Sequence, residues 1–189
     1  GDSLAGYWTN AVAVPEQADL CLHAARRSQA EGGVSQGVDI RLRKRIPIEG
    51  GLGGGSSDAA TTLVALNEIW GLRWDAARLA VLGAGLGADV PFFVQGSNAW
   101  GEGIGERLTP IELPERHYAI VHPGIGVRTA EVFQASELTR NSPKTTIRGF
   151  LKAGGRNDCE PVVSRRFPEV ARALSWLAAR GDARLTGTG

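Results

Sequence analysis

Apolar and polar residues alternate over positions 38–43, with Val38, Ile40 and Leu42 as the apolar members. A period of two predicts a strand with one buried face. Further along, apolar residues recur at the spacing of three to four that is typical of a helix. They are Ala59, Leu63, Leu66 and Trp70, followed by Gly71 as a C-cap. The glycine-rich stretch 50–60 therefore lies between a strand and a helix.

Caps, prolines and shorter apolar stripes outline the rest of the chain. In the first part of the chain they predict a short strand over 10–14, a helix over 20–31 capped by Asp19 and ended by Gly32 and Gly33, a helix from Asp75 to Gly87, and a short helix with Pro91 in its first turn. A Gly-rich connection over 100–110 and a hinge over 111–114 follow. Beyond the hinge they predict a buried strand over 117–121, a helix capped by Thr129, helices over 147–152 and from 157–161, a last helix entered through Pro168 and ended by Gly181, and a strand over 184–186.

The glycine stretch predicts an anion site. Five of the six residues 50–55 are glycine, which lets backbone N–H groups approach a ligand, and the following helix N-terminus adds free donors and a positive dipole. Phosphate is the usual anion at such a nest of amides. The stretch lacks the closing Gly-Lys-Ser/Thr of a Walker loop and fits the dinucleotide fingerprint poorly. The alternative is a flexible surface loop in which Ser56 or Ser57 only caps the helix.

Three further side chains have simple structural interpretations. Asp89 precedes Val90 and Pro91, and from the residues alone a helix N-cap is the favoured role for such an aspartate. His23 lies beside apolar neighbours at helical spacing, so we interpret it as a packed or surface histidine rather than a metal ligand. Asp58 follows the glycine stretch, and we expect its carboxylate to face away from a bound phosphate, because the two charges repel each other.

Composition narrows the classes of partner and compartment. The 189 residues are 42% hydrophobic and 22% charged, as in an ordinary globular protein. A net charge of +1 offers no basic surface for nucleic acid. No apolar run approaches the ~20 residues of a membrane span, and no signal-peptide pattern is present. Cys21 and Cys159 lack metal-ligand spacing, which favours a reduced, cytoplasmic protein. We expect no nucleic-acid or membrane partner, and a monomer or weak homodimer.

The sequence has no methionine, begins at Gly1 and stops within a second glycine turn, Leu185-Thr186-Gly187-Thr188-Gly189. We therefore expect that it omits parts of a longer protein.

Five stretches together resemble the GHMP kinases. They are Lys44-Arg45-Ile46-Pro47 with the glycine loop, Gly87-Ala88-Asp89-Val90-Pro91, His122-Pro123-Gly124, Asn157-Asp158-Cys159-Glu160 and Leu185-Thr186-Gly187-Thr188-Gly189. The doubled glycines followed by Ser-Ser-Asp-Ala-Ala are similar to the GHMP subfamily of the non-mevalonate isoprenoid pathway, and the resemblance covers residues 19–189. It implies transfer of the γ-phosphoryl group of ATP, with Mg²⁺, to a hydroxyl of a small cytidyl substrate.

The resemblance also implies roles for individual residues. Asp89 would be the catalytic base. Leu20 and Lys44 would contact the adenosine part, and Thr129 and Phe133 the cytidyl substrate. The triphosphate would be held by the loop residues Pro47, Gly50, Gly51, Leu52, Gly53, Gly54, Gly55, Ser56 and Ser57. No metal ligand is assigned.

The implied fold class is α+β, the two-domain GHMP kinase fold. Residues 1–113 would form an ATP-binding domain similar to ribosomal protein S5 domain 2, with a mixed sheet and crossover helices. Residues 114–189 would form a ferredoxin-like C-terminal domain, truncated at its end, with helices on a sheet. The substrates would bind in a cleft between the domains.

Two family motifs have no counterpart in this sequence: an N-terminal Pro-Ala-Lys-Leu-Asn-like run, whose lysine stabilises the transferring phosphate, and a Gly-Tyr-His that stacks on cytosine. Three alternatives therefore stay open: another small-molecule kinase of the family, an inactive nucleotide-binding fragment, and an RNA-binding module. The net charge argues against the last.

Overall fold

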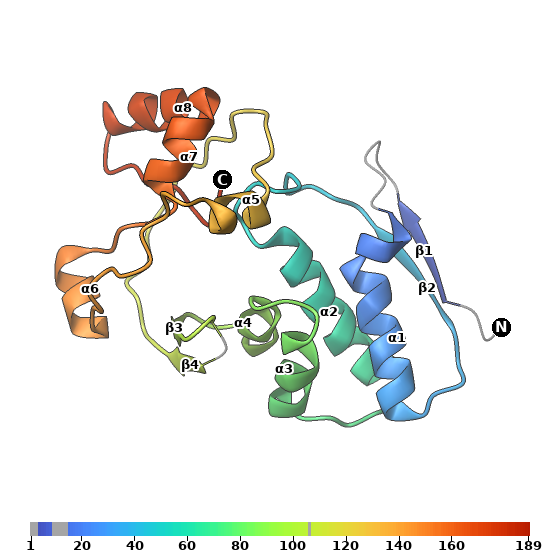
Figure 1. Cartoon of the computed structure of the whole chain (residues 1–189). Helices are drawn as coiled ribbons and strands as arrows, with labels where there is room; N and C mark the ends of the chain where they lie inside the picture. Colours follow the sequence, from blue (N-terminus) through green and yellow to red (C-terminus); the bar gives the residue numbers. More distant parts are fainter. Residues whose placement is uncertain (1–3, 9–14, 106) are drawn as a thin grey trace. The chain divides into compact units, whose positions relative to one another are not determined.

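The computed structural model describes residues 4–8, 15–105 and 107–189 (Figure 1). By its internal contacts the chain groups into two compact units. One unit joins Gly1–Arg45 to Gly54–Glu115, and the other joins Ile46–Gly53 to Arg116–Gly189. The domain division after residue 113 stays a prediction. Among the described residues, no helix has both the length and the apolar character that crossing a bilayer requires.

The first unit begins with a parallel pair of strands joined by a helix. Strand β1 (Leu4–Trp8) pairs with β2 (Val38–Leu42), with Leu4 opposite Val38 and Trp8 opposite Leu42. Parallel neighbours need a long crossover connection. It is supplied here by the 3-10 turn Glu16–Ala18 and helix α1 (Leu20–Gly32), which lies against both strands (Figure 1). The strand predicted over 38–43 is confirmed within one residue.

The ends of α1 match the sequence prediction. The carboxylate of Asp19 accepts hydrogen bonds from the backbone N–H groups of Cys21 and Leu22, at 2.8 and 3.3 Å. Gly33 closes the helix at a φ of 60°, a left-handed conformation that glycine adopts without steric cost. The cap and the terminating glycine are therefore confirmed.

Three further helices complete the core of the first unit. They are α2 (Gly54–Ile69), α3 (Ala76–Ala84) and α4 (Val90–Gln95). Their apolar faces meet that of α1 in one cluster of Ala24, Ala59, Ala60, Leu63, Leu79 and Val90. The buried amide of Asn67 exchanges two hydrogen bonds with the backbone of Trp74, at 2.9 and 3.1 Å, and so fixes the turn from α2 to α3.

Three predictions for the first unit need correction. Helix α3 ends at Ala84 with Gly85 as its cap, three residues before the predicted Gly87. The Gly-rich connection over 100–110 contains an antiparallel hairpin of β3 (Ala99–Glu102) and β4 (Arg107–Pro110). The described strands form two separate pairs, one parallel and one antiparallel, rather than one mixed sheet. The strand predicted over 10–14 falls outside the described residues.

The second unit is helical in its described part. Helices α5 (Thr129–Gln134), α6 (Ile147–Ala153), α7 (Glu160–Arg166) and α8 (Pro168–Ala178) follow in order, and α7 packs on α8 (Figure 1). The buried residues of its core are Val127, Val132, Ala135, Leu138, Cys159, Val162, Val163, Val170 and Leu185. Pro168 is in the first turn of α8, as predicted, and a helix starts at Glu160 and Pro161, within the predicted stretch 157–161.

The strands predicted for this unit are wrong. Residues 117–121 form no strand, and Tyr118 and Ile120 are 79% and 66% exposed. An apolar run of this kind becomes a strand only when a neighbouring strand accepts its hydrogen bonds, and the described residues offer none. Residues 184–186 likewise form no strand, and the backbone of Leu185 is bonded instead by the side chains of Asn157 and Glu160. The described part thus differs from the helix-on-sheet arrangement expected over 114–189. Thr129 is the first helical residue of α5, and its predicted cap position belongs to Arg128.

Candidate functional site

The glycine loop enters helix α2 through two left-handed residues. Gly51 and Gly53 both have a φ of 65°, a conformation that favours glycine over all other residues. Helix α2 begins at Gly54, so Gly54–Ser57 form its first turn. The N–H groups of a first turn have no partner inside the helix and carry the positive end of its dipole. Because the helix starts before Ser56 and Ser57, the interpretation of either serine as its N-cap is wrong.

Two other segments of the first unit lie beside this first turn. A β-carbon added to Gly55 would lie 3.6 Å from Cδ1 of Leu20, and one added to Gly87 would lie 3.8 Å from Oγ of Ser56. Leu20 and the turn that leads to Asp89 are therefore neighbours of the turn that the sequence assigns to phosphate.

Asp89 occupies the N-cap position of α4, but its side chain makes no capping hydrogen bond, and the residue is exposed. The capping role favoured from the residues alone is therefore not observed. An exposed carboxylate two residues after Gly87 has the chemistry of a proton acceptor for a ligand held at the first turn of α2.

Lys44 and Asp58 form an ion pair across the first unit. The lysine Nζ lies 2.5 Å from Oδ2 of Asp58, and the two side chains are only 11% and 28% exposed. The pair compensates the negative charge of Asp58 at the N-terminal end of α2. Close by, burial raises the pKa of the Cys21 thiol to about 11, so this thiol is neutral at pH 7 and does not act as a nucleophile.

In the second unit, the glycine loop packs backbone to backbone against the glycine turn Thr186–Gly189. The hydroxyl of Thr186 donates to the carbonyl of Gly51 at 3.1 Å. A β-carbon on Gly51 would lie 2.1 Å from the carbonyl oxygen of Thr186 and 2.3 Å from that of Gly189. Both contacts are impossible for any other residue type, so the position requires glycine.

The residues predicted to contact the cytidyl substrate lie on α5. The hydroxyl oxygen of Thr129 is 2.9 Å from that of Thr188, which ties α5 to the same glycine turn. Phe133 is 57% exposed and presents its ring to solvent. The guanidinium of Arg140 donates to the carbonyls of Phe133 at 2.6 Å and of Ala135 and Leu138 at 3.1 Å each, which fixes the end of this helix.

The predicted site residues thus divide between the two units. The first unit contains Leu20, Lys44, Gly54, Gly55, Ser56, Ser57 and Asp89, and the second contains Pro47, Gly50, Gly51, Leu52, Gly53, Thr129 and Phe133. Sequence reasoning missed the roles of Asn157, Glu160 and Arg140 in holding loop backbone. The position of Asn157 and Glu160 just before Pro161, at a helix start, was the available signal.

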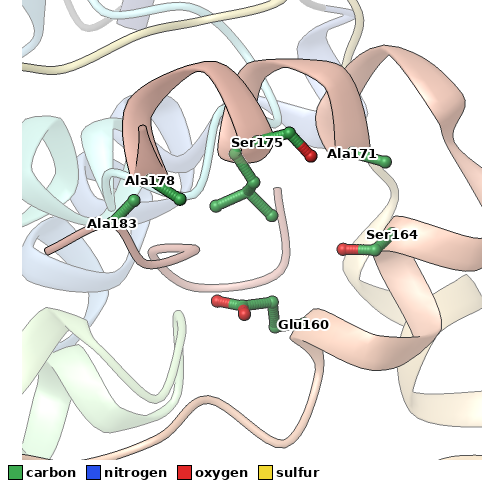
Figure 2. Close-up of a pocket in the computed structure, with 7 residues that line it drawn as sticks. Glu160, Ser164, Ala171, Ser175, Ala178 and Ala183 are labelled. Carbon is green, nitrogen blue, oxygen red and sulfur yellow. The ribbon is translucent and has the colours of Figure 1, made fainter. Parts of the chain in front are cut away.

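A hollow of about 250 Å³ lies between α7 and α8 in the second unit. Figure 2 shows Glu160 and Ser164 of α7 facing Ala171, Ser175 and Ala178 of α8 across it. None of the predicted site residues lines this hollow. Its carboxylate, Glu160, already accepts a hydrogen bond from the backbone N–H of Leu185 at 2.8 Å.

Comparisons with known proteins agree on one family. The sequence model of the GHMP kinases N terminal domain matches residues 19–97. A 4-diphosphocytidyl-2-C-methyl-D-erythritol kinase of Pseudomonas paraeruginosa is 54% identical over 181 residues, which are 96% of this chain and 64% of that protein. The enzyme of the same name from Nitrosococcus oceani is also 54% identical, over 93% of this chain and 63% of its own length. The chain therefore spans somewhat less than two thirds of these curated relatives.

A crystal structure of a 4-(cytidine 5'-diphospho)-2C-methyl-D-erythritol kinase is similar to this chain. Its TM-score is 0.77 at 32% sequence identity, and the match covers 97% of this chain and 70% of that one.

Proposed function

Since the chain belongs to the GHMP kinase family, we propose that it phosphorylates the 2-hydroxyl of 4-diphosphocytidyl-2-C-methyl-D-erythritol with ATP, in the non-mevalonate pathway to isoprenoid precursors. The observation that carries the proposal is the 54% identity to kinases of that name over 96% of the chain. The left-handed glycines just before α2 support it, because glycines allow backbone N–H groups to approach a phosphate at the start of a helix.

In the proposed reaction, the N–H groups of residues 51–57 hold the triphosphate and neutralise part of its charge. Asp89 orients the substrate hydroxyl and accepts its proton as the oxygen attacks the γ-phosphorus. The bond between that phosphorus and the bridging oxygen breaks, and ADP leaves with the electron pair. Leu20 and Lys44 contact the adenosine part, whereas Thr129 and the exposed ring of Phe133 contact the cytidyl part.

Magnesium enters this proposal as part of the substrate MgATP. Among the described residues, no group of three or more His, Cys, Asp or Glu side chains is arranged to hold a metal ion. The carboxylate that follows the loop in the first turns of α2, Asp58, is engaged by Lys44. Mg²⁺ in kinases is held largely by phosphate oxygens and water, with one or two carboxylates. We therefore assign no residue of this chain as a metal ligand.

We further propose a cytoplasmic location, a small-molecule partner in place of nucleic acid or membrane, and a monomer or weak homodimer. Two free, buried cysteines support a reducing compartment.

The test is ADP release by the full chain in the presence of MgATP and the cytidyl substrate. Asp89→Asn should lower kcat at least about 100-fold, because the general base is lost, and should leave the Kd of ATP within about twofold. Asp39→Asn, which neutralises another exposed aspartate of the same unit, is the matched control and should behave as wild type.

Full turnover by Asp89→Asn would remove the catalytic role of this residue. Faster turnover of homoserine or mevalonate would favour a different small-molecule kinase of the family. ATP binding without turnover of any acceptor would favour a nucleotide-binding protein without kinase activity.

A further inference from the structure

Two side chains hold the backbone of the second glycine turn from the α7 side. The amide nitrogen of Asn157 donates to the carbonyls of Leu185 at 3.1 Å and of Gly187 at 2.7 Å. A carboxylate oxygen of Glu160 accepts the N–H of Leu185 at 2.8 Å. Both backbone groups of Leu185 are therefore bonded to side chains, in the way that a neighbouring strand would bond them.

The orientation of the Asn157 amide is fixed by a third hydrogen bond of this side chain. Its Oδ1 accepts the N–H of Cys159 at 2.9 Å. The nitrogen consequently faces the two carbonyls, which only a donor can satisfy. Asn157 and Glu160 lie at the N-terminal end of α7, whose residues Val162 and Val163 are buried in the core. The two side chains thus connect the turn to a rigid part of the unit.

The opposite side of the turn fixes the glycine loop. Because the Thr186 hydroxyl donates to the Gly51 carbonyl, it sets the plane of the peptide between Gly51 and Leu52. The peptide unit is planar and trans, so the N–H of Leu52 points opposite to that carbonyl. The direction of one N–H of the proposed phosphate loop therefore depends on where residue 186 is held.

We propose that Asn157 and Glu160 are positioning residues for the glycine loop, acting through the turn Leu185–Gly187. The pair holds Leu185 and Gly187, Thr186 between them holds the carbonyl of Gly51, and the Leu52 N–H is aimed as a result. Neither side chain touches the nucleotide. The consequence for nucleotide affinity rests on the proposed function, whereas the mechanical link between turn and loop does not.

The link is tested first by hydrogen exchange on the full chain without ligand, at the Leu185 amide and over residues 50–53. Asn157→Asp, which replaces the donor facing two carbonyls by an acceptor of the same shape, should accelerate exchange at both places. Glu160→Ala should do the same, while Glu160→Gln keeps an oxygen acceptor for the Leu185 N–H and should restore slow exchange. Asp158→Asn is the matched control, because Asp158 lies in the same loop as Asn157 but bonds Arg156 and Ser142.

Nucleotide affinity is measured next, by titration with MgATP at a temperature where circular dichroism shows each variant folded. Asn157→Asp should raise the Kd of ATP about tenfold, the change that corresponds to about 1.4 kcal/mol. Glu160→Ala should raise it in the same direction, whereas Glu160→Gln and Asp158→Asn should leave it within about twofold of wild type.

Faster exchange at Leu185 without faster exchange over 50–53 would overturn the proposal, because the turn would then move independently of the loop. An unchanged Kd in Asn157→Asp, with wild type binding ATP, would overturn it as well. If wild type binds no ATP, the proposed function fails, and the exchange over residues 50–53 alone decides whether the positioning role stands.

Discussion

The side-chain nitrogen of Lys44 lies 2.5 Å from the carboxylate of Asp58, which follows the glycine loop in the N-terminal part of α2. A carboxylate there suits the helix dipole but repels a phosphate bound at the same helix end. The ion pair resolves this conflict within the first unit, since Lys44 compensates the charge while the dipole interaction is kept. This explains how Asp58 is accommodated next to a stretch that the sequence predicts to bind an anion.

The contribution of this ion pair to the free energy of unfolding can be measured with a double-mutant cycle. Lys44→Met and Asp58→Asn should each lower the free energy of unfolding, because each removes one charge of a partly buried ion pair. Their coupling energy should be about 1 kcal/mol, at the upper end of the range for exposed pairs. Urea unfolding of the two single variants and the double variant gives the result. Additive effects would show that the pair contributes nothing to stability.

The contact between Gly51 and the C-terminal turn predicts a strong substitution effect. In Gly51→Ala the new β-carbon meets two backbone carbonyls, and the residue is also strained at a φ of 65°. Gly124→Ala is the control in the same unit, because it has a φ of 84° and no neighbouring atom within 4 Å. The control should cost about 1–2 kcal/mol for the left-handed conformation alone.

Gly51→Ala should cost clearly more in thermal or urea unfolding, and it should also weaken ATP binding. Equal destabilisation by the two variants would show that the loop moves away from the turn at little cost.

The ion pair between Glu137 and Arg166 predicts a pH dependence of stability. Arg166 donates to both carboxylate oxygens of Glu137, at 2.7 and 3.0 Å, and these hydrogen bonds lower the pKa of that carboxyl from 4.5 to about 2. A carboxyl whose folded pKa is depressed stabilises the protein above its unfolded pKa and loses this contribution as the pH falls. The contribution is therefore full above about pH 5 and decreases between pH 4.5 and 2.

Urea unfolding of wild type and Glu137→Gln from pH 6 to pH 3 checks this expectation. Wild type should be more stable at pH 6, and the difference should narrow toward pH 3. In an Arg166→Gln background the same substitution should have little effect at any pH. A difference that is constant over the whole range would contradict the role of the pair.

The sequence predicted the parts of the fold that depend on near neighbours. The alternation over 38–43, the cap Asp19, the terminating Gly33 and Pro168 of α8 all act within about four residues. The left-handed loop before α2 belongs to the same class, because glycine permits that conformation whatever surrounds it. The glycine loop was predicted as a site for this local reason and from the family resemblance, whereas Asp89 was predicted as a catalytic residue from the resemblance alone.

The incorrect predictions concern strands, whose formation depends on pairing with other strands. The run 117–121 has the composition of a buried strand, yet no described strand pairs with it, and its side chains are exposed. The hairpin β3–β4 was missed because its glycines read as a loop, whereas cross-strand pairing decided its conformation.

By itself, the sequence determined where the helices and one strand form, and it predicted which stretch binds an anion. The tertiary structure alone decided the partners: Asp58 for Lys44, and Thr186 for Gly51, 135 positions away along the chain. The physical reason is that a cap or a turn is selected by a few adjacent residues. A contact between distant backbones depends instead on the packing of a whole core, which no local pattern records.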